Sequence, residues 1–241
     1  AAFDDNHRPF SVEISDGYIW VGGSGLNKGE IINEGCINWT RYTNNSTYEN
    51  SQNYNNALPS DWIVGIHFQI LNIGVRIWTI NWTDPIGSHH LSYTDDYGET
   101  WVREKYFSNL GSLQAVVYNL HSIDSNPNDD VNLEDQLYAS TSKGLFKFVG
   151  LNDWEKEEIA NDQIFDEMGI ISENDSNFEV HAAIIDQNNN FLIGTTEGLL
   201  VRDAFNQFYY PAYVDDVLAG TLDNMLVFPN PYLLDNHNYA T

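Results

Sequence analysis

The chain is poor in cysteine, in basic residues and in long apolar runs. Cys36 is its only cysteine, which excludes an internal disulfide bond. Lys and Arg together number 10 against 35 Asp and Glu, which gives a formal net charge of -25 at pH 7. Nucleic acid binds along a basic track, so a nucleic-acid partner is excluded. No apolar run is long enough to cross a bilayer, and we therefore expect no transmembrane segment.

What remains is an acidic, aromatic-rich chain. Hydrophobic residues make up 42% and aromatic residues 14% of the 241 positions, which is enough for a substantial core. The acidic balance suits an extracellular protein, a cation-rich medium or calcium binding. Cys36 lies beside a predicted strand, and we expect it to be a buried, unreactive thiol.

One short pattern occurs four times with variations. It consists of an apolar strand, a turn, a Gly-Leu pair and then a single aromatic residue. The copies start near Ile19, Ile77, Leu137 and Phe191, and the second is the loosest because it carries an insertion. Repeats that are built from strands and recur every few tens of residues are typical of β-propellers rather than helical solenoids.

Each repeat divides into four strands, the first of which we predict at residues 10–14, 63–68, 115–123 and 180–185. We therefore predict an all-β fold: a β-propeller of about four blades, each a four-stranded antiparallel sheet, either closed as a small ring or cut from a larger propeller. The predicted propeller domain covers residues 1–226, with blades at 8–43, 60–107, 113–159 and 178–213 and partial strands at 214–226. Residues 227–241 are predicted to form a linker or the start of a truncated further domain.

The aromatic residue that closes each repeat is predicted to be buried between neighbouring sheets. These residues are Trp39, Trp101, Trp154 and Phe208. Two segments between the repeats break the pattern. Residues 43–56 are rich in Asn and are predicted to form a polar loop, and residues 161–177 a connector with one short acidic helix or turn.

The segment from Thr94 to Trp101 carries a defined turn motif. Asp96 can accept backbone N–H groups across its own turn, Gly98 supplies a left-handed residue, and Trp101 fills the core below, while Thr100 precedes it. The segment resembles the Asp-box of sialidase-like and other propellers. In those families the motif is a folding device that lies away from the catalytic face.

Two further resemblances concern the origin of the chain. The segments Ile19–Leu26 and Phe191–Leu199 resemble the repeats of two-component-regulator-type propellers, a resemblance that extends over most of residues 8–213. The segment Val227–Tyr232 resembles the opening of the C-terminal sorting domains of proteins exported by the type IX system; the alternative is a proline-containing linker. Together these resemblances imply an extracellular or cell-surface location.

Three histidines recur at a similar place in the repeats. His67 precedes Trp78 by 11 positions and His181 precedes Leu192 by 11, while His121 precedes Tyr138 by 17 across an acidic insertion. We expect these imidazoles to occupy one equivalent position on the innermost strands. There they either converge in the channel on a metal or an anion, or are ordinary strand histidines satisfied by their neighbours.

Calcium is the one cofactor that the sequence suggests. Two loops alternate oxygen-bearing side chains as hard-cation loops do. Their candidate ligands are Asp124, Asn126, Asn128, Asp130, Asp186, Asn188 and Asn190. Neither loop has the glycine and terminal glutamate of an EF-hand, and Asx-rich turns also form without metal.

Three functions fit these observations. The first is a secreted or cell-surface, non-catalytic propeller that binds a protein or glycan partner at its loop face or channel. The second is a sialidase-like hydrolase, although Arg8-Pro9 lacks the middle Ile of that family's Arg-Ile-Pro stretch, and no catalytic residue can be assigned. The third is a structural subunit of a larger surface assembly.

Overall fold

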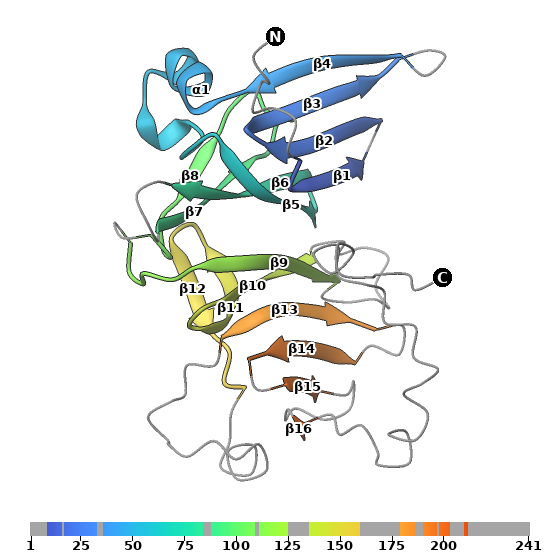
Figure 1. Ribbon diagram of the computed structural model, residues 1–241, viewed down its shortest axis with the longest axis vertical. Coiled ribbons are helices and arrows are strands. Elements are labelled where there is room, and N and C mark those ends of the chain that lie inside the picture. The colour runs from blue at the N-terminus through green and yellow to red at the C-terminus, as the bar shows by residue number, and fades with distance from the viewer. Residues whose placement is uncertain are drawn as a thin grey trace, which may run out of the picture. The chain divides into compact units, whose positions relative to one another are not determined.

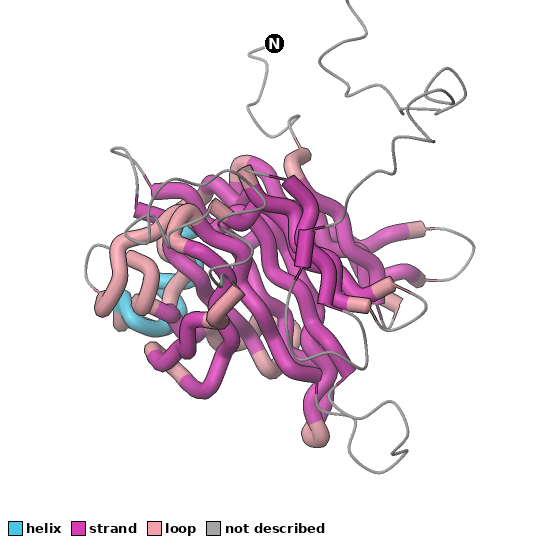
Figure 2. Tube along the Cα trace, turned by 90° about the horizontal axis from the view of Figure 1, so that it is seen from below, coloured by secondary structure: helices cyan, strands magenta, loops and turns pink. Residues whose placement is uncertain are grey.

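The computed structural model describes residues 9–15, 17–32, 36–83, 88–108, 111–124, 135–159, 179–186, 190–196, 198–202 and 210–211. Contacts divide the chain into two compact units, Ala1–Pro211 and Ala212–Thr241, and all described residues belong to the first. Strands dominate its regular structure (Figures 1 and 2). The connector predicted at 161–177, the partial strands at 214–226 and the linker at 227–241 lie outside the described residues.

The strands form four antiparallel sheets of four strands each, and within every sheet they lie side by side in chain order. The first sheet contains β1 (Ser11–Ser15), β2 (Tyr18–Gly23), β3 (Gly25–Ile31) and β4 (Ile37–Tyr42). The second contains β5 (Trp62–Leu71), β6 (Gly74–Thr83), β7 (Ser88–Thr94) and β8 (Val102–Glu104). The third contains β9 (Val117–Asp124), β10 (Asp135–Thr141), β11 (Gly144–Gly150) and β12 (Asp153–Lys156). The fourth contains β13 (Val180–Ile185), β14 (Phe191–Thr195), β15 (Gly198–Arg202) and β16 (Tyr210–Pro211). The predicted all-β fold of four-stranded sheets is confirmed.

Each sheet packs against the next one along the chain. Three clusters of buried hydrophobic residues join the first sheet to the second, the second to the third and the third to the fourth. A ring from the second strand of one sheet is central to each cluster: Trp20 shares a cluster with Ile77, Trp78 with Trp154, and Tyr138 with Phe191. The first strands also meet in the same order, because β1 contacts β5, β5 contacts β9, and β9 contacts β13.

The predicted aromatic spacers behave differently from one sheet to another. Trp101 and Trp154 are 2% and 3% exposed and lie inside the core clusters. Trp39 was predicted to be buried and instead is 50% exposed. It pairs with Gly29, on the face of the first sheet opposite to Trp20, and no other described sheet covers that face. Phe208 lies outside the described residues.

The Asn-rich segment after β4 is not the loop that its composition predicts. It contains a helix, α1 (Asn44–Ser51), followed by a 3-10 turn at Tyr54–Asn56. Thr43 caps the helix: its side chain accepts from the Ser46 N–H, while the Ser46 side chain accepts from the Thr43 N–H. This reciprocal pair satisfies two donors at the helix start and offsets the poor helix propensity of Asn and Ser. Gln52 ends the helix in a left-handed conformation.

Cys36 is also placed differently from its prediction. The thiol was expected to be buried, and it is exposed at the residue preceding β4. Its backbone carbonyl accepts a hydrogen bond from Ile32, so the residue closes the connection from β3 to β4 rather than filling the core. Among the described residues, no helix combines the length and the apolar character needed to cross a membrane.

The stacking of the sheets makes a prediction about two tryptophans. Trp78 is fully buried between two sheets, so Trp78→Ala should lower the free energy of unfolding by about 3–5 kcal/mol. Trp39→Ala removes the same side chain from the half-exposed face and should cost about 1 kcal/mol or less. Urea denaturation followed by circular dichroism measures both. Equal losses would contradict the assignment of buried and exposed faces.

Candidate binding surface on the innermost strands

One position on the innermost strands recurs from sheet to sheet. The residue at this position lies directly opposite a large apolar residue of the second strand. The paired residues are Glu13 and Trp20, His67 and Trp78, His121 and Tyr138, and Ile184 and Leu192. His67 and His121 therefore occupy equivalent positions, as their spacing suggests. His181 does not, because the residue opposite Leu192 is Ile184. His181 itself lies where the β13–β14 register is irregular, between Val180 and Ala182.

His67 connects the second sheet to the third. Its Nε2 lies 2.7 Å from the Ser122 hydroxyl on β9, and its ring centroid lies 6.5 Å from that of His121. Burial, together with the nearby His121, lowers the pKa of His67 to about 4. The imidazole is therefore neutral at pH 7. It acts as a hydrogen-bonding partner between two sheets.

His121 makes the corresponding connection from the third sheet to the fourth. Its Nε2 accepts a hydrogen bond from the Ile185 N–H on β13 at 3.2 Å. In a neutral imidazole this leaves the proton on Nδ1. Burial lowers the pKa of His121 as well. Both histidines thus use a ring nitrogen to join neighbouring sheets, which is the alternative to a ligand role that the sequence left open.

Metal binding by the candidate residues stays a prediction. No group of three His, Cys, Asp or Glu side chains in the described part of the chain lies close enough together to hold a metal ion. Asn126, Asn128, Asp130 and Asn188 lie outside the described residues, and the side chain of Asp124 is not described.

Asp186 and Asn190, the remaining candidates for calcium, bind each other. The Asp186 carboxylate accepts from the Asn190 backbone N–H and from its side-chain amide, each at 2.8 Å. The Asp186 N–H in turn donates to the Asn190 carbonyl at 2.9 Å. These bonds close the turn between β13 and β14, and calcium binding remains a prediction.

The exposed part of the innermost strands carries a different cluster, at the starts of β9 and β13. The Tyr118 hydroxyl donates to Glu179 Oε2 at 3.0 Å, and the Tyr118 ring lies 4.9 Å from that of His181. His181 Nε2 lies 4.0 Å from the same Glu179 oxygen. Burial and the neighbouring carboxylate raise the pKa of Tyr118, so its hydroxyl remains a donor. An aromatic ring, an imidazole and a carboxylate thus share one accessible surface.

The sequence pointed to one member of this cluster. The spacing of the histidines indicates His181, but no pattern indicates Tyr118 or Glu179. The sequence offers only their positions as a guide to these two residues. Tyr118 lies three positions before His121, and Glu179 directly precedes a strand that begins with Val180. What joins them is the contact between β9 and β13, which the sequence does not reveal.

The turn from Thr94 to Trp101 is held by its own side chains. Asp96 accepts from the Thr100 N–H at 2.8 Å and from the Thr100 hydroxyl at 2.6 Å, and Thr94 donates to it at 2.7 Å. Burial alone would raise the pKa of Asp96, but the bonds from Thr100 and Thr94 outweigh it and lower the pKa. Gly98 has a φ of 98°, and an added Cβ would meet the Tyr42 ring at 2.8 Å. The geometry is that of a rigid structural turn.

The fully buried carboxylate among the described residues is also structural. Glu104 is 1% exposed at the end of β8. Burial raises its pKa, although the backbone N–H groups of Tyr106 and Asn152 donate to it. Asn152 lies between β11 and β12, so Glu104 joins the outer edges of the second and third sheets.

Comparison with known proteins identifies the fold. No protein-family model matches the chain, and no curated protein matches it. Two solved structures of the extracellular domain of BT4673 from B. thetaiotaomicron, described as a hybrid two-component system and as a one-component system, are similar. Their TM-scores are 0.51 and 0.53, at 16% and 14% sequence identity. Each similarity covers 86% of this chain but only 22% of the solved chain. The four sheets therefore correspond to part of a larger, propeller-containing domain.

The shift at His67 predicts how stability depends on pH. The unfolded chain binds a proton at His67 below about pH 6.5 and the folded chain does so only near pH 4, so unfolding is favoured as the pH falls through this window. The loss at pH 5 should be about 2 kcal/mol relative to pH 8. His67→Gln should remove this part of the pH dependence, as measured by urea midpoints at pH 5 and pH 8. An unchanged difference between the two midpoints would contradict the assignment.

Proposed function

We propose that the chain is part of an extracellular or cell-surface β-propeller that binds a protein or glycan partner without catalysing a reaction on it. The observation that carries the proposal is the exposed cluster of Tyr118, Glu179 and His181 on the innermost strands. Propellers present such strands around a channel, where one aromatic ring and a few polar groups suffice for recognition. The extracellular origin of the two similar structures and the sorting-domain resemblance of Val227–Tyr232 support the location.

Three of the described arginines favour binding over sialidase-like hydrolysis. A sialidase site needs three arginines around one carboxylate. Here Arg41 donates to the Ser24 carbonyl, Arg76 forms two hydrogen bonds with Asp95, and Arg103 donates to the Leu58 carbonyl. Each arginine thus supports a different turn or insertion, and these three do not converge.

A glycan array probed with the purified chain, together with hydrolysis assays on the same glycans and on a chromogenic sialoside, tests the proposal. We expect binding without turnover. Tyr118→Ala should reduce binding by about tenfold, because it removes both a ring and the hydroxyl that holds Glu179. Tyr54→Ala is the matched control, since Tyr54 is a 62% exposed tyrosine in the helical insertion. Turnover, or equal effects of the two variants, would contradict the proposed function.

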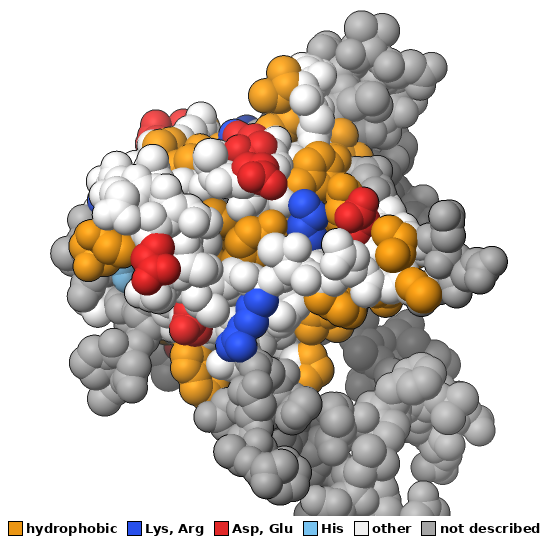
Figure 3. Space-filling model, turned by 90° about the horizontal axis from the view of Figure 1, so that it is seen from above, with side chains coloured by type: hydrophobic (Ala, Val, Ile, Leu, Met, Phe, Trp, Pro, Cys, Tyr) orange, Lys and Arg blue, Asp and Glu red, His pale blue; other side chains and the backbone are white. Residues whose placement is uncertain are grey.

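A role as a structural subunit is favoured by a separate observation. The face of the first sheet that carries Trp39 also presents Val12 and Ile14, which are 54% and 65% exposed. Figure 3 views the molecule from the side of α1 and β4 and shows hydrophobic patches among the polar side chains. The opposite face of this sheet is covered by the second sheet. A further propeller sheet is therefore the partner whose shape suits the exposed face.

A further inference from the structure

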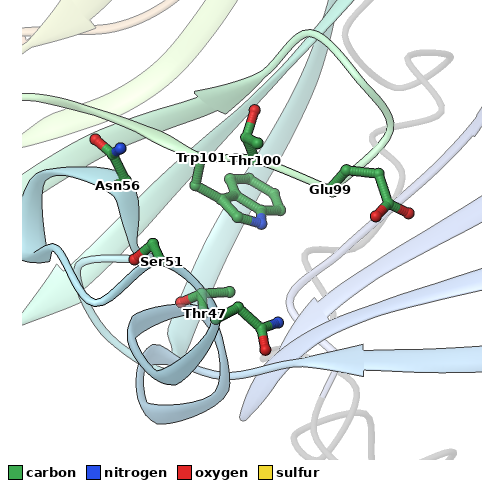
Figure 4. A pocket seen from close by; sticks show the side chains of 8 residues that line it. Thr47, Ser51, Asn56, Glu99, Thr100 and Trp101 are labelled. Carbon is green, nitrogen blue, oxygen red and sulfur yellow. The ribbon is translucent and has the colours of Figure 1, made fainter.

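A small pocket lies between the helical insertion and the Thr94–Trp101 turn. It has a volume of about 190 Å³. Thr47 of α1 and Asn56 of the 3-10 turn line one side, and Glu99 and Trp101 line the other (Figure 4). Asn50 of α1 also lines the pocket. The volume is smaller than that of sites for drug-sized ligands, so it admits one small ring or one such unit of a larger molecule.

The pocket contains a buried donor without a partner. Trp101 is 2% exposed, and its Nε1 makes no hydrogen bond to any described residue. Figure 4 shows the nitrogen-bearing edge of the indole facing the side chains of α1. A buried N–H group without an acceptor is costly, and a ligand oxygen in the pocket would remove that cost.

The walls are fixed before any ligand arrives. The Thr47 hydroxyl donates to the Thr43 carbonyl at 2.8 Å and accepts from the Leu58 N–H at 3.0 Å. The Thr100 hydroxyl is held by Asp96. The side chains of Asn50 and Asn56 make no hydrogen bond to another described residue and remain available at the rim. A preformed site of this kind loses little entropy on binding.

The available groups indicate the chemistry of the ligand. The pocket offers an indole N–H, amide donors and acceptors from Asn50 and Asn56, and the carboxylate of Glu99. No Lys or Arg is among the described residues that line it. Glu99 and the net charge of -25 disfavour an anion. A hydroxyl group both donates and accepts, so a ring that carries several hydroxyl groups can pair with donors and acceptors of this kind together.

We propose that this pocket binds one ring of a neutral sugar. It uses the helical insertion and the Thr94–Trp101 turn, whereas the proposed partner surface uses β9 and β13. The sugar site and the proposed partner surface can therefore be tested independently of each other.

Ligand-observed saturation-transfer NMR on the full chain tests the inference. The probes are glucose, galactose, mannose and N-acetylglucosamine, with glucose 6-phosphate as the anionic comparison. We expect saturation of at least one neutral sugar and weaker binding of the phosphate. Trp101→Phe should weaken the binding of that sugar by about fivefold, the loss expected for one hydrogen bond. Trp20→Phe is the matched control. Trp20 lies in the same core cluster and also has an unpartnered Nε1, but it does not line the pocket, so binding should be retained.

A second pair of variants leaves the core intact. Asn50→Ala removes a rim amide and should weaken binding of the same sugar about threefold or more. Asn45→Ala, on the same helix but outside the pocket, should leave it unchanged. The inference is overturned if none of the four neutral sugars is saturated, if glucose 6-phosphate binds more tightly than they do, or if both Asn variants bind the sugar equally.

Discussion

The packing of a ring from the second strand of each of the first three sheets against the following sheet is the interaction on which the structure depends. Trp20, Trp78 and Tyr138 occupy equivalent positions, and each is buried against the next sheet in the chain. A two-faced sheet with one apolar side cannot remain stable alone, so each sheet is stabilised by its successor. Trp39 is consistent with this dependence. No described sheet packs against its face, and its ring is half exposed.

Polar contacts at the two edges of the sheets complete this packing. Along the inner edge, His67 and His121 join consecutive sheets through neutral imidazoles, and Glu104 does the same at an outer edge through backbone donors. Such buried polar groups stabilise a fold only when each is satisfied by a partner. Because these groups are engaged in packing, the Tyr118 cluster and the pocket next to α1 are the surfaces on which we propose recognition.

The repeats predicted the four sheets well because an apolar strand, a turn and an aromatic residue recur together. All three signals indicate the same four-stranded sheet. The sequence placed His67 and His121 in equivalent positions, once the insertion that lengthens the β9–β10 hairpin is allowed for, and the two residues do lie opposite Trp78 and Tyr138. It misplaced His181, because the β13–β14 hairpin is shorter than the β5–β6 hairpin, so that Leu192 lies opposite Ile184 rather than opposite His181. It also missed α1, whose stability comes from a Thr43–Ser46 capping pair rather than from propensity. The pocket could not be predicted at all, because Thr47 and Trp101 are brought together only by tertiary packing.

A double-mutant cycle between Trp78 and Trp154 tests the stacking of the sheets most directly. Their ring centroids lie 6.2 Å apart across the second and third sheets. Urea denaturation of Trp78→Leu, Trp154→Leu and the double variant would yield their coupling energy. Direct packing between the two sheets predicts a coupling of about 0.5–1.5 kcal/mol. Strict additivity of the two substitutions would contradict the account, because it would mean that the rings do not meet.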